Sequence, residues 1–252
     1  MARIFNFSMR FRWKYNYLKP LLVEKNEWKF YLDHIAAGDT VFDIGANVGE
    51  LTLLFSKFCG SEGRVHSFEP TVSTFNKLQN LVNSVQLKNV KINNLAVTNQ
   101  SGVVSFNVYE DEFSSWNTLA KRPLHNYGIS IQDPKSVDIA SISIDDYCER
   151  NSIKYIDLLK IDVEGAELNV LIGARKMFSE RKIKNCVFEF GQTIFDMGNT
   201  IQEFENFFSS HGYGIKNVSE DQYIFPIDRN SGEAHFAVLY AYSEGLKRNL
   251  SR

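Results

Sequence analysis

The fold is decided by residues 41–50, which read Val-Phe-Asp-Ile-Gly-Ala-Asn-Val-Gly-Glu. An apolar strand, Thr40–Ile44, runs directly into a glycine turn, and a helical pattern begins at Gly49. In an open parallel sheet, ligands bind beyond the carboxyl ends of the strands. Glycines at such a turn let the backbone approach a ligand closely, and a helix N-terminus favours an anionic group. The stretch therefore predicts a ligand-binding loop at one edge of an α/β sheet.

Strand and helix patterns alternate along the rest of the chain. The expected strands are Thr40–Ile44, Arg64–Phe68, Val90–Asn94, Tyr155–Ile161, Asn185–Phe190, Gly214–Asn217, Tyr223–Phe225 and Phe236–Tyr242. The expected helices are Gly49–Cys59, Val72–Val85, Gly165–Phe178 and one that contains Phe204, Phe207 and Phe208. Two more segments, Val103–Val108 and Asp138–Ser143, are expected to pair as an added hairpin or edge. This alternation predicts a parallel sheet with helices on both faces.

Composition narrows the class of protein. The chain has 252 residues and a net charge of −2, which suits one α/β domain and argues against a nucleic-acid partner bound through bulk charge. No apolar run approaches the roughly 20 residues of a membrane-spanning helix. The widely spaced Cys59, Cys148 and Cys186 form neither a CxxC metal site nor a disulfide framework. We therefore expect buried, reduced thiols and a cytoplasmic protein.

Residues 1–25 form a basic-aromatic arm, and we place the catalytic domain at residues 26–252. Residues 1–20 contain no acid; their basic residues are Arg3, Arg10, Arg12, Lys14 and Lys19, and their aromatic residues are Phe5, Phe7, Phe11, Trp13, Tyr15 and Tyr17. The aromatic residues fall mostly on odd positions, which suits a strand as well as a helix. We expect the arm to dock on the domain or to pack against a second subunit in a homodimer. Peripheral contact of residues 1–20 with a membrane surface is the alternative.

Two acids at neighbouring strand ends indicate the ligand. Asp43 lies two residues before Gly45, where its carboxylate would repel a pyrophosphate but suit a cation. Glu69 follows the strand Arg64–Phe68, where an acid can accept both hydroxyls of a ribose. A ligand with a cation, a carboxylate and a ribose fits this pattern, and S-adenosylmethionine has all three. A structural turn with a helix-capping acid is the alternative interpretation.

Four blocks of sequence carry a family resemblance. They are Asp43-Ile-Gly-Ala-Asn-Val-Gly49, Phe68-Glu-Pro70, Asn94-Leu-Ala-Val97 and Leu158-Leu-Lys-Ile-Asp-Val-Glu-Gly-Ala-Glu167. Their order and spacing resemble the FkbM family of S-adenosylmethionine-dependent methyltransferases, and the last block is the most specific. The resemblance implies a Rossmann-like class I methyltransferase fold with a mostly parallel seven-stranded sheet. It also implies O-methylation of a sugar or secondary-metabolite hydroxyl, and hence a small-molecule or glycan acceptor.

We expect S-adenosylmethionine to contact residues from all four blocks. The expected cofactor-binding residues are Asp43, Gly45, Ala46, Asn47, Gly49, Glu69, Pro70, Asn94, Ala96 and Asp162. The adenine is expected to meet the backbone of Leu95 and Ala96 and the Asn94 amide. A plain strand end without cofactor contacts is the alternative at these three positions.

Methyl transfer to a hydroxyl needs a means of removing the hydroxyl proton, either a general base or a metal ion. Asp162 follows the strand Tyr155–Ile161, and we expect it to act as base or orienter, with Glu164 and Glu189 beside it in the catalytic group. These three acids could together hold Mg²⁺, which prefers carboxylates and waters. Lys160 lies two residues before Asp162 on the same strand face, where burial would require an acid partner.

Substrate specificity is expected in residues 110–137, the longest irregular stretch, because long loops in compact domains are often functional. Trp116 in this stretch could stack on a sugar ring or fold onto the core. Two rival functions remain. One is methylation of a nitrogen or of a nucleic acid, and the other is a catalytically silent module that only binds the cofactor.

Overall fold

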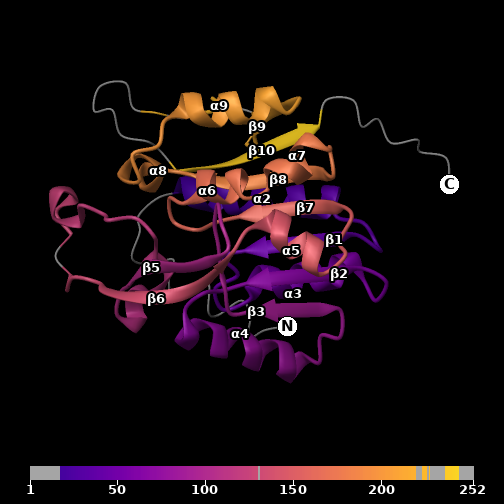
Figure 1. Ribbon diagram of the computed structural model, residues 1–252, viewed down its shortest axis with the longest axis horizontal. Coiled ribbons are helices and arrows are strands. Elements are labelled where there is room, and N and C mark those ends of the chain that lie inside the picture. Colours follow the sequence, from indigo (N-terminus) through magenta and orange to yellow (C-terminus); the bar gives the residue numbers. More distant parts are fainter. Residues whose placement is uncertain (1–17, 130, 220–222, 226, 228–235, 244–252) are drawn as a thin grey trace.

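The computed structural model describes residues 18–129, 131–219, 223–225, 227 and 236–243, and its centre is a seven-stranded sheet (Figure 1). The strand order is β3-β2-β1-β7-β8-β10-β9. The strands β1 (Thr40–Ile44), β2 (Arg64–Phe68), β3 (Val90–Asn93), β7 (Ile156–Ile161) and β8 (Ile183–Phe190) are parallel. Antiparallel to its two neighbours, β10 (Ala237–Ser243) lies between β8 and β9 (Tyr213–Asn217). Because β1 has β2 on one side and β7 on the other, the strand order reverses between β1 and β7, where α/β sheets bind ligands.

Helices cover both faces of this sheet because the strand residues are buried on both sides. On one face, α2 (Leu18–His34) and α3 (Glu50–Cys59) pack against an apolar cluster that contains Val41, Leu158 and Val187. The other face is covered by α5 (Ile144–Arg150), α6 (Glu167–Ile172), α7 (Arg175–Ser179), α8 (Gln192–Asp196) and α9 (Ile201–Ser210). The helix α4 (Val72–Val85) buries Leu78 against Ala46, which lies in the loop between β1 and α3. We call this loop, residues 45–49, the glycine loop.

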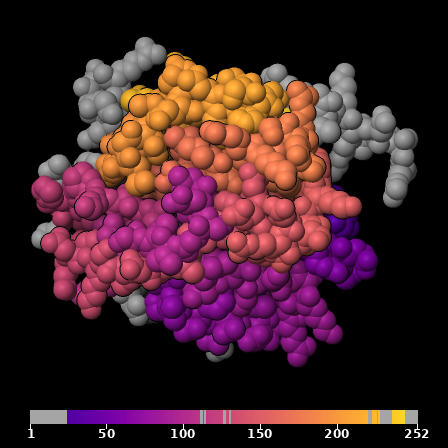
Figure 2. Space-filling model, in the orientation of Figure 1, coloured from indigo at the N-terminus to yellow at the C-terminus, as the bar shows by residue number. Residues whose placement is uncertain are grey.

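A second, three-stranded sheet adjoins the parallel strands. It contains β4 (Ala96–Val97), β5 (Gly102–Val108) and β6 (Lys135–Ile142) in the order β4-β6-β5, and β5 and β6 are antiparallel as expected. Two 3₁₀ helices, η1 (Asp111–Trp116) and η2 (Leu124–Tyr127), follow β5. Figure 1 shows β5 and β6 on the side toward which the parallel strands point. In Figure 2 the magenta and pink side chains of this region form the left side of the molecule.

Two expectations about secondary structure are wrong. The helix expected over Gly165–Phe178 is divided into α6 and α7, because the Asp145 carboxylate accepts hydrogen bonds from the backbone N–H groups of Lys176 (2.8 Å) and Met177 (3.0 Å) and so caps a separate helix. The segment Tyr223–Phe225 is not a strand. Its Tyr223 is 80% exposed, and of the three residues only Phe225 packs against the core, so this short apolar run is not held in the sheet.

The N-terminal helix was not expected from the pattern. It runs without a break from Leu18 to His34, across residue 25, where the expected arm ends. Residues 1–17 of the arm lie outside the described residues. Cys59, Cys148 and Cys186 are buried free thiols, as expected. Within the described ranges, no helix combines the length and the apolar character needed to span a bilayer.

Candidate active site

The glycine loop is pressed against the end of β7. Gly45 has a φ of +76°, and a Cβ atom placed on it would lie 1.7 Å from the backbone oxygen of Asp162. Gly49 precedes α3 with a φ of +94°, and its Cβ would lie 2.5 Å from Cδ1 of Leu78. A side chain at Gly45 would collide with backbone atoms, one at Gly49 would force the Leu78 side chain to move, and both conformations favour glycine. The two glycines therefore allow the loop to contact β7 on one side and α4 on the other.

Glu69 joins this loop to the end of β2. Its Oε2 accepts a hydrogen bond from the N–H of Asn47 (3.1 Å), and its Oε1 accepts one from the N–H of Thr71 (2.9 Å). Burial raises the pKa of Glu69, while these hydrogen bonds oppose the shift. A carboxylate has about four lone-pair positions, so roughly two remain for hydroxyl groups of a ligand.

A pocket opens between the glycine loop, Glu69 and the end of β7. Leu95, Val97 and Phe106 line its apolar part, and Asn117 and Leu119 line it from the segment after β5. Of the cofactor-binding residues expected from the sequence, the pocket is lined by Gly45, Asn47, Glu69, Pro70, Ala96 and Asp162. The expected residues Asp43, Ala46, Gly49 and Asn94 do not line it.

Asp43 lies beneath the pocket rather than in it. Its side chain is fully buried; Oδ2 accepts a hydrogen bond from Oγ1 of Thr52 (2.6 Å), and Oδ1 lies 3.6 Å from Nζ of Lys160. The reason is the strand alternation, which directs Asp43 toward the α2 and α3 face. Asp43 was expected to face a cofactor cation, and in the structure its carboxylate lies beside a lysine of the protein.

Three other expected residues contact the loops around the pocket and do not line the pocket itself; they are Ala46, Gly49 and Asn94. The Asn94 amide donates hydrogen bonds to the backbone oxygens of Glu69 (2.9 Å) and Pro70 (2.8 Å), so it fixes the turn after β2. Ala46 is buried, and its N–H donates to the backbone oxygen of Phe68 (2.9 Å).

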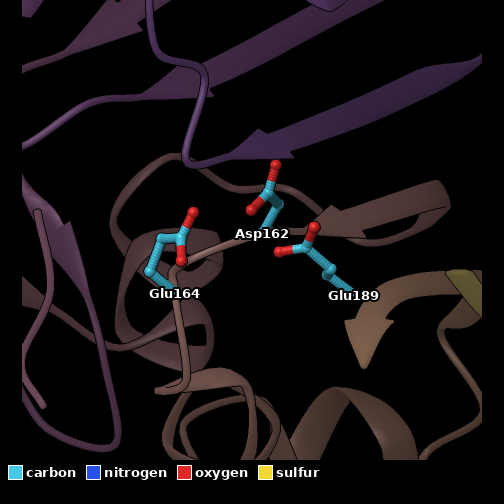
Figure 3. A group of neighbouring side chains, drawn as sticks. All are labelled: Asp162, Glu164 and Glu189. Carbon is cyan, nitrogen blue, oxygen red and sulfur yellow. The ribbon is translucent and has the colours of Figure 1, made fainter. Parts of the chain in front are cut away.

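Three carboxylates converge beside this pocket, and two of them, Asp162 and Glu164, line it. Asp162 follows β7, Glu164 lies in the next loop, and Glu189 lies near the end of β8; one oxygen of each lies within 4.8 Å of the others. Figure 3 shows the three side chains pointing toward one another. Glu164 has a φ of +56°, a conformation that non-glycine residues rarely adopt and that is common at functional sites. The geometry suits proton transfer or the binding of a cation.

The electrostatics of the three acids differ. Burial and then Asp162 raise the pKa of Glu164 to about 8, and Arg122 opposes this shift. Burial, followed by Asp162 and Glu164, raises the pKa of Glu189 well above its ordinary value. Both glutamates thus favour the protonated form near neutral pH. Oδ2 of Asp162 lies 3.2 Å from the ammonium of Lys160, so this carboxylate has a positive charge beside it.

Glu167 stabilises the loop that carries Glu164. Its Oε1 accepts hydrogen bonds from the N–H groups of Val163 (3.0 Å) and Gly165 (3.2 Å), and the residue is only 1% exposed. Burial raises the pKa of Glu167 to about 7. Its role here is structural, because its hydrogen bonds shape the backbone between Asp162 and α6.

The segment after β5 contacts the backbone and the side chain of Glu164, and these contacts were not predicted from the sequence. Thr118 donates through Oγ1 to the backbone oxygen of Glu164 (2.6 Å). Nη1 of Arg122 lies 3.6 Å from Oε2 of Glu164, and its Nε lies 3.8 Å from Oδ2 of Asp196. The Arg122 guanidinium also lies 5.4 Å from the ring centre of Trp116. The sole sequence signal was the position of these residues in the longest irregular stretch.

Comparison with known proteins agrees with this geometry. The family described as methyltransferase FkbM domain matches residues 43–215. The chain is 26% identical over 77% of its length to the 31-O-demethyl-FK506 methyltransferase FkbM of Streptomyces tacrolimicus, covering 80% of that protein. It is 26% identical over 62% of its length to the hexuronic acid methyltransferase AglP of Haloferax volcanii, covering 58% of that protein.

A solved structure shows the same fold. The methyltransferase FkbM from Methylobacillus flagellatus KT matches 85% of this chain with a TM-score of 0.52 and 16% identity, and the match covers 50% of that chain. The strand order and the glycine loop at the switch between β1 and β7 are those of a Rossmann-like class I methyltransferase fold. The chain therefore belongs to the FkbM methyltransferase domain family.

Proposed function

We propose that this protein transfers the methyl group of S-adenosylmethionine to a hydroxyl oxygen of a sugar or of a secondary metabolite. The names of two relatives support an acceptor of this kind, since one acts on a demethylated FK506 and the other on a hexuronic acid. The observation that carries the proposal is Asp162, which lines the pocket and at the same time belongs to the group of three carboxylates.

The pocket offers a place for each part of the cofactor. Glu69 has lone pairs left that would accept the ribose hydroxyls, and the pocket residues Pro70, Ala96 and Phe106 would hold the adenine. The N-terminus of α3, beyond Gly45, would favour the carboxylate of the methionine part. Asp162 would then be the pocket carboxylate that faces the sulfonium and its methyl group.

The chemical step is an in-line displacement. The acceptor oxygen approaches the methyl carbon at about 3–3.5 Å, the new O–C bond forms, and the S–C bond breaks to leave neutral S-adenosylhomocysteine. The hydroxyl proton passes to Asp162. Protonated Glu164 and Glu189 can donate hydrogen bonds to other oxygens of the acceptor, because burial favours their neutral forms.

A magnesium ion is the alternative means of acidifying the hydroxyl. Asp162, Glu164 and Glu189 offer one oxygen each within 4.8 Å, and carboxylate oxygens are the ligands that Mg²⁺ prefers. Turnover in the presence of EDTA separates the two mechanisms. Undiminished turnover supports Asp162 as the base, and a loss that added Mg²⁺ restores supports the metal.

The test combines binding and turnover. Calorimetric titration with S-adenosylmethionine establishes the cofactor, and formation of S-adenosylhomocysteine is then followed with hexoses, hexuronic acids and their methyl glycosides. Turnover with a hydroxyl acceptor that disappears in Asp162→Asn supports the proposal. Turnover on amines alone would favour an N-methyltransferase, and cofactor binding without turnover on any acceptor would favour a silent binding module.

A further inference from the structure

A row of buried polar side chains crosses the sheet beneath the pocket. In the parallel pairing, Asp43 of β1 lies opposite Ser67 of β2 on one side and Lys160 of β7 on the other. All three residues are buried, on the face that α2 and α3 cover. Thr52 of α3 joins the row, with its Oγ1 at 2.6 Å from Oδ2 of Asp43 and at 2.9 Å from Oγ of Ser67. The surrounding strand residues on this face are apolar, so the row is a distinct feature of the core.

Lys160 is the member of this row that reaches the active site. Its Nζ lies 3.1 Å from the backbone oxygen of Gly45, 3.2 Å from Oδ2 of Asp162 and 3.6 Å from Oδ1 of Asp43. An ammonium has three N–H donors, and here three acceptors surround it. The Lys160 side chain is 5% exposed, whereas that of Asp162 is 39% exposed and faces the pocket.

The charge of Lys160 is secured by its neighbours. Burial alone would lower the pKa of Lys160, but Asp162, then Asp43, then Glu27 of α2 raise it above its ordinary value. Lys160 in turn lowers the pKa of Glu164 and of Glu69, which burial raises. The charge of Lys160 therefore influences Glu164, in the group of three carboxylates, and also Glu69, beside the glycine loop.

We propose that Lys160 is a positioning residue that fixes the Asp162 carboxylate against the glycine loop, so that the base stands where the cofactor's methyl group lies. This inference rests on the proposed function. The ammonium ties the Gly45 carbonyl, which belongs to the cofactor loop, to the Asp162 carboxylate, which accepts the proton. Asp43 serves as the buried counter-charge that lets a lysine occupy this position.

A purely structural role for Lys160 makes a different prediction. A buried ion pair can often be replaced by apolar residues of similar volume without loss of stability. If Lys160 only filled the core, replacing the pair would affect all ligands of the pocket equally. If Lys160 positions Asp162, the replacement selectively weakens binding of the sulfonium cation relative to its uncharged product.

The test compares the affinities of S-adenosylmethionine and S-adenosylhomocysteine by calorimetry at pH 7.5. The variant Asp43→Asn with Lys160→Met removes one charge of each sign, so the net charge of the protein is unchanged. We expect the preference for S-adenosylmethionine to fall about fivefold, the effect of one charge at about 4 Å in a water-exposed site. Asp162→Asn calibrates the complete loss of that charge. The matched control is Lys29→Met with Asp33→Asn, an exposed pair at the same distance of 3.6 Å, which should keep the wild-type preference.

Each outcome decides between the ideas. A double variant that keeps the wild-type preference overturns the role of Lys160, and so does a wild-type protein that binds both compounds without preference. If the double variant does not fold, Lys160→Met alone decides, because it removes the ammonium that contacts Asp162 and leaves Asp162 in place. A fall in the preference supports the proposal, and an unchanged or increased preference overturns it. A wild-type protein that binds neither compound instead refutes the proposed function.

Discussion

Replacing Gly45 with alanine tests the contact on which the pocket depends. The new Cβ would lie 1.7 Å from the backbone oxygen of Asp162, whereas carbon and oxygen atoms in contact stay about 3.3–3.6 Å apart. The glycine loop and the end of β7 must therefore separate by roughly 1.5 Å or more. Gly45 and Asp162 both line the pocket, so this separation changes cofactor contacts directly.

Gly45→Ala is expected to lower both the free energy of unfolding and the affinity for the cofactor. An alanine at a φ of +76° loses about 1–2 kcal/mol because of its left-handed conformation, and overpacking adds about 1–3 kcal/mol, so the free energy of unfolding should fall by their sum. Losing one charge-assisted hydrogen bond to the cofactor costs about 1.5–3 kcal/mol, which weakens binding about 10- to 150-fold. The assays are urea unfolding and calorimetric titration with S-adenosylmethionine.

Gly38→Ala is the matched control. Gly38 has a φ of +89° just before β1, but a Cβ on it would meet nothing within 4 Å. It should lose only the conformational part, about 1–2 kcal/mol, and bind S-adenosylmethionine as the wild type does. Binding of the cofactor by Gly45→Ala within about threefold of the wild type would contradict this prediction.

Four further predictions follow from the site. Asp162→Asn should bind S-adenosylmethionine within about tenfold of the wild type and lose turnover at least about 100-fold, measured as S-adenosylhomocysteine formation; full turnover would remove Asp162 from the chemistry. Wild-type affinity for S-adenosylmethionine should fall as the pH is lowered below neutrality, because burial raises the pKa of Glu69 and its protonated form loses acceptor positions. Glu69→Gln should bind more weakly and show a flatter pH profile in calorimetry; a profile as steep as the wild type's would show that another group titrates. Burial raises the pKa of Glu167 to about 7, so the folded state binds this proton more tightly than the unfolded state does. Ionisation of Glu167 therefore lowers the free energy of unfolding, by nothing below about pH 4.5 and by about 3 kcal/mol at about pH 7. Glu167→Gln keeps the acceptor oxygen for Val163 and Gly165, so the free energy of unfolding in urea should depend less on pH in this variant. An unchanged pH dependence would show that another group causes it. EDTA should leave turnover unchanged, because Asp162 already has Lys160 as its cation; a loss restored by Mg²⁺ would contradict this.

Much of the fold was predictable because its signals are local. Buried strands such as Thr40–Ile44 and Arg64–Phe68 are short apolar runs between turn residues, and the structure has them with the expected bounds. Gly45 and Gly49 stand next to the strand in the sequence, so the loop could be predicted from them directly. The division of the expected helix Gly165–Phe178 was not predictable, because it depends on a cap from Asp145, which lies far away in sequence.

The site was predictable in part, for a related reason. Residues at strand ends, such as Glu69 and Asp162, reach the pocket because topology brings parallel strand ends together. Asp43 was expected there too, but the sequence does not show that a lysine on the neighbouring strand takes up its charge. The contacts of Arg122 and Thr118 depend on how an irregular segment folds back, and no periodic pattern encodes that path.

The most direct test of the proposed function is a crystal structure of the protein with S-adenosylhomocysteine. We predict that the ribose hydroxyls donate hydrogen bonds to the Glu69 carboxylate, that the adenine lies beside Ala96, and that the sulfur lies next to Asp162. A ligand bound away from the loop between β1 and α3, or one whose sulfur points away from Asp162, would contradict it.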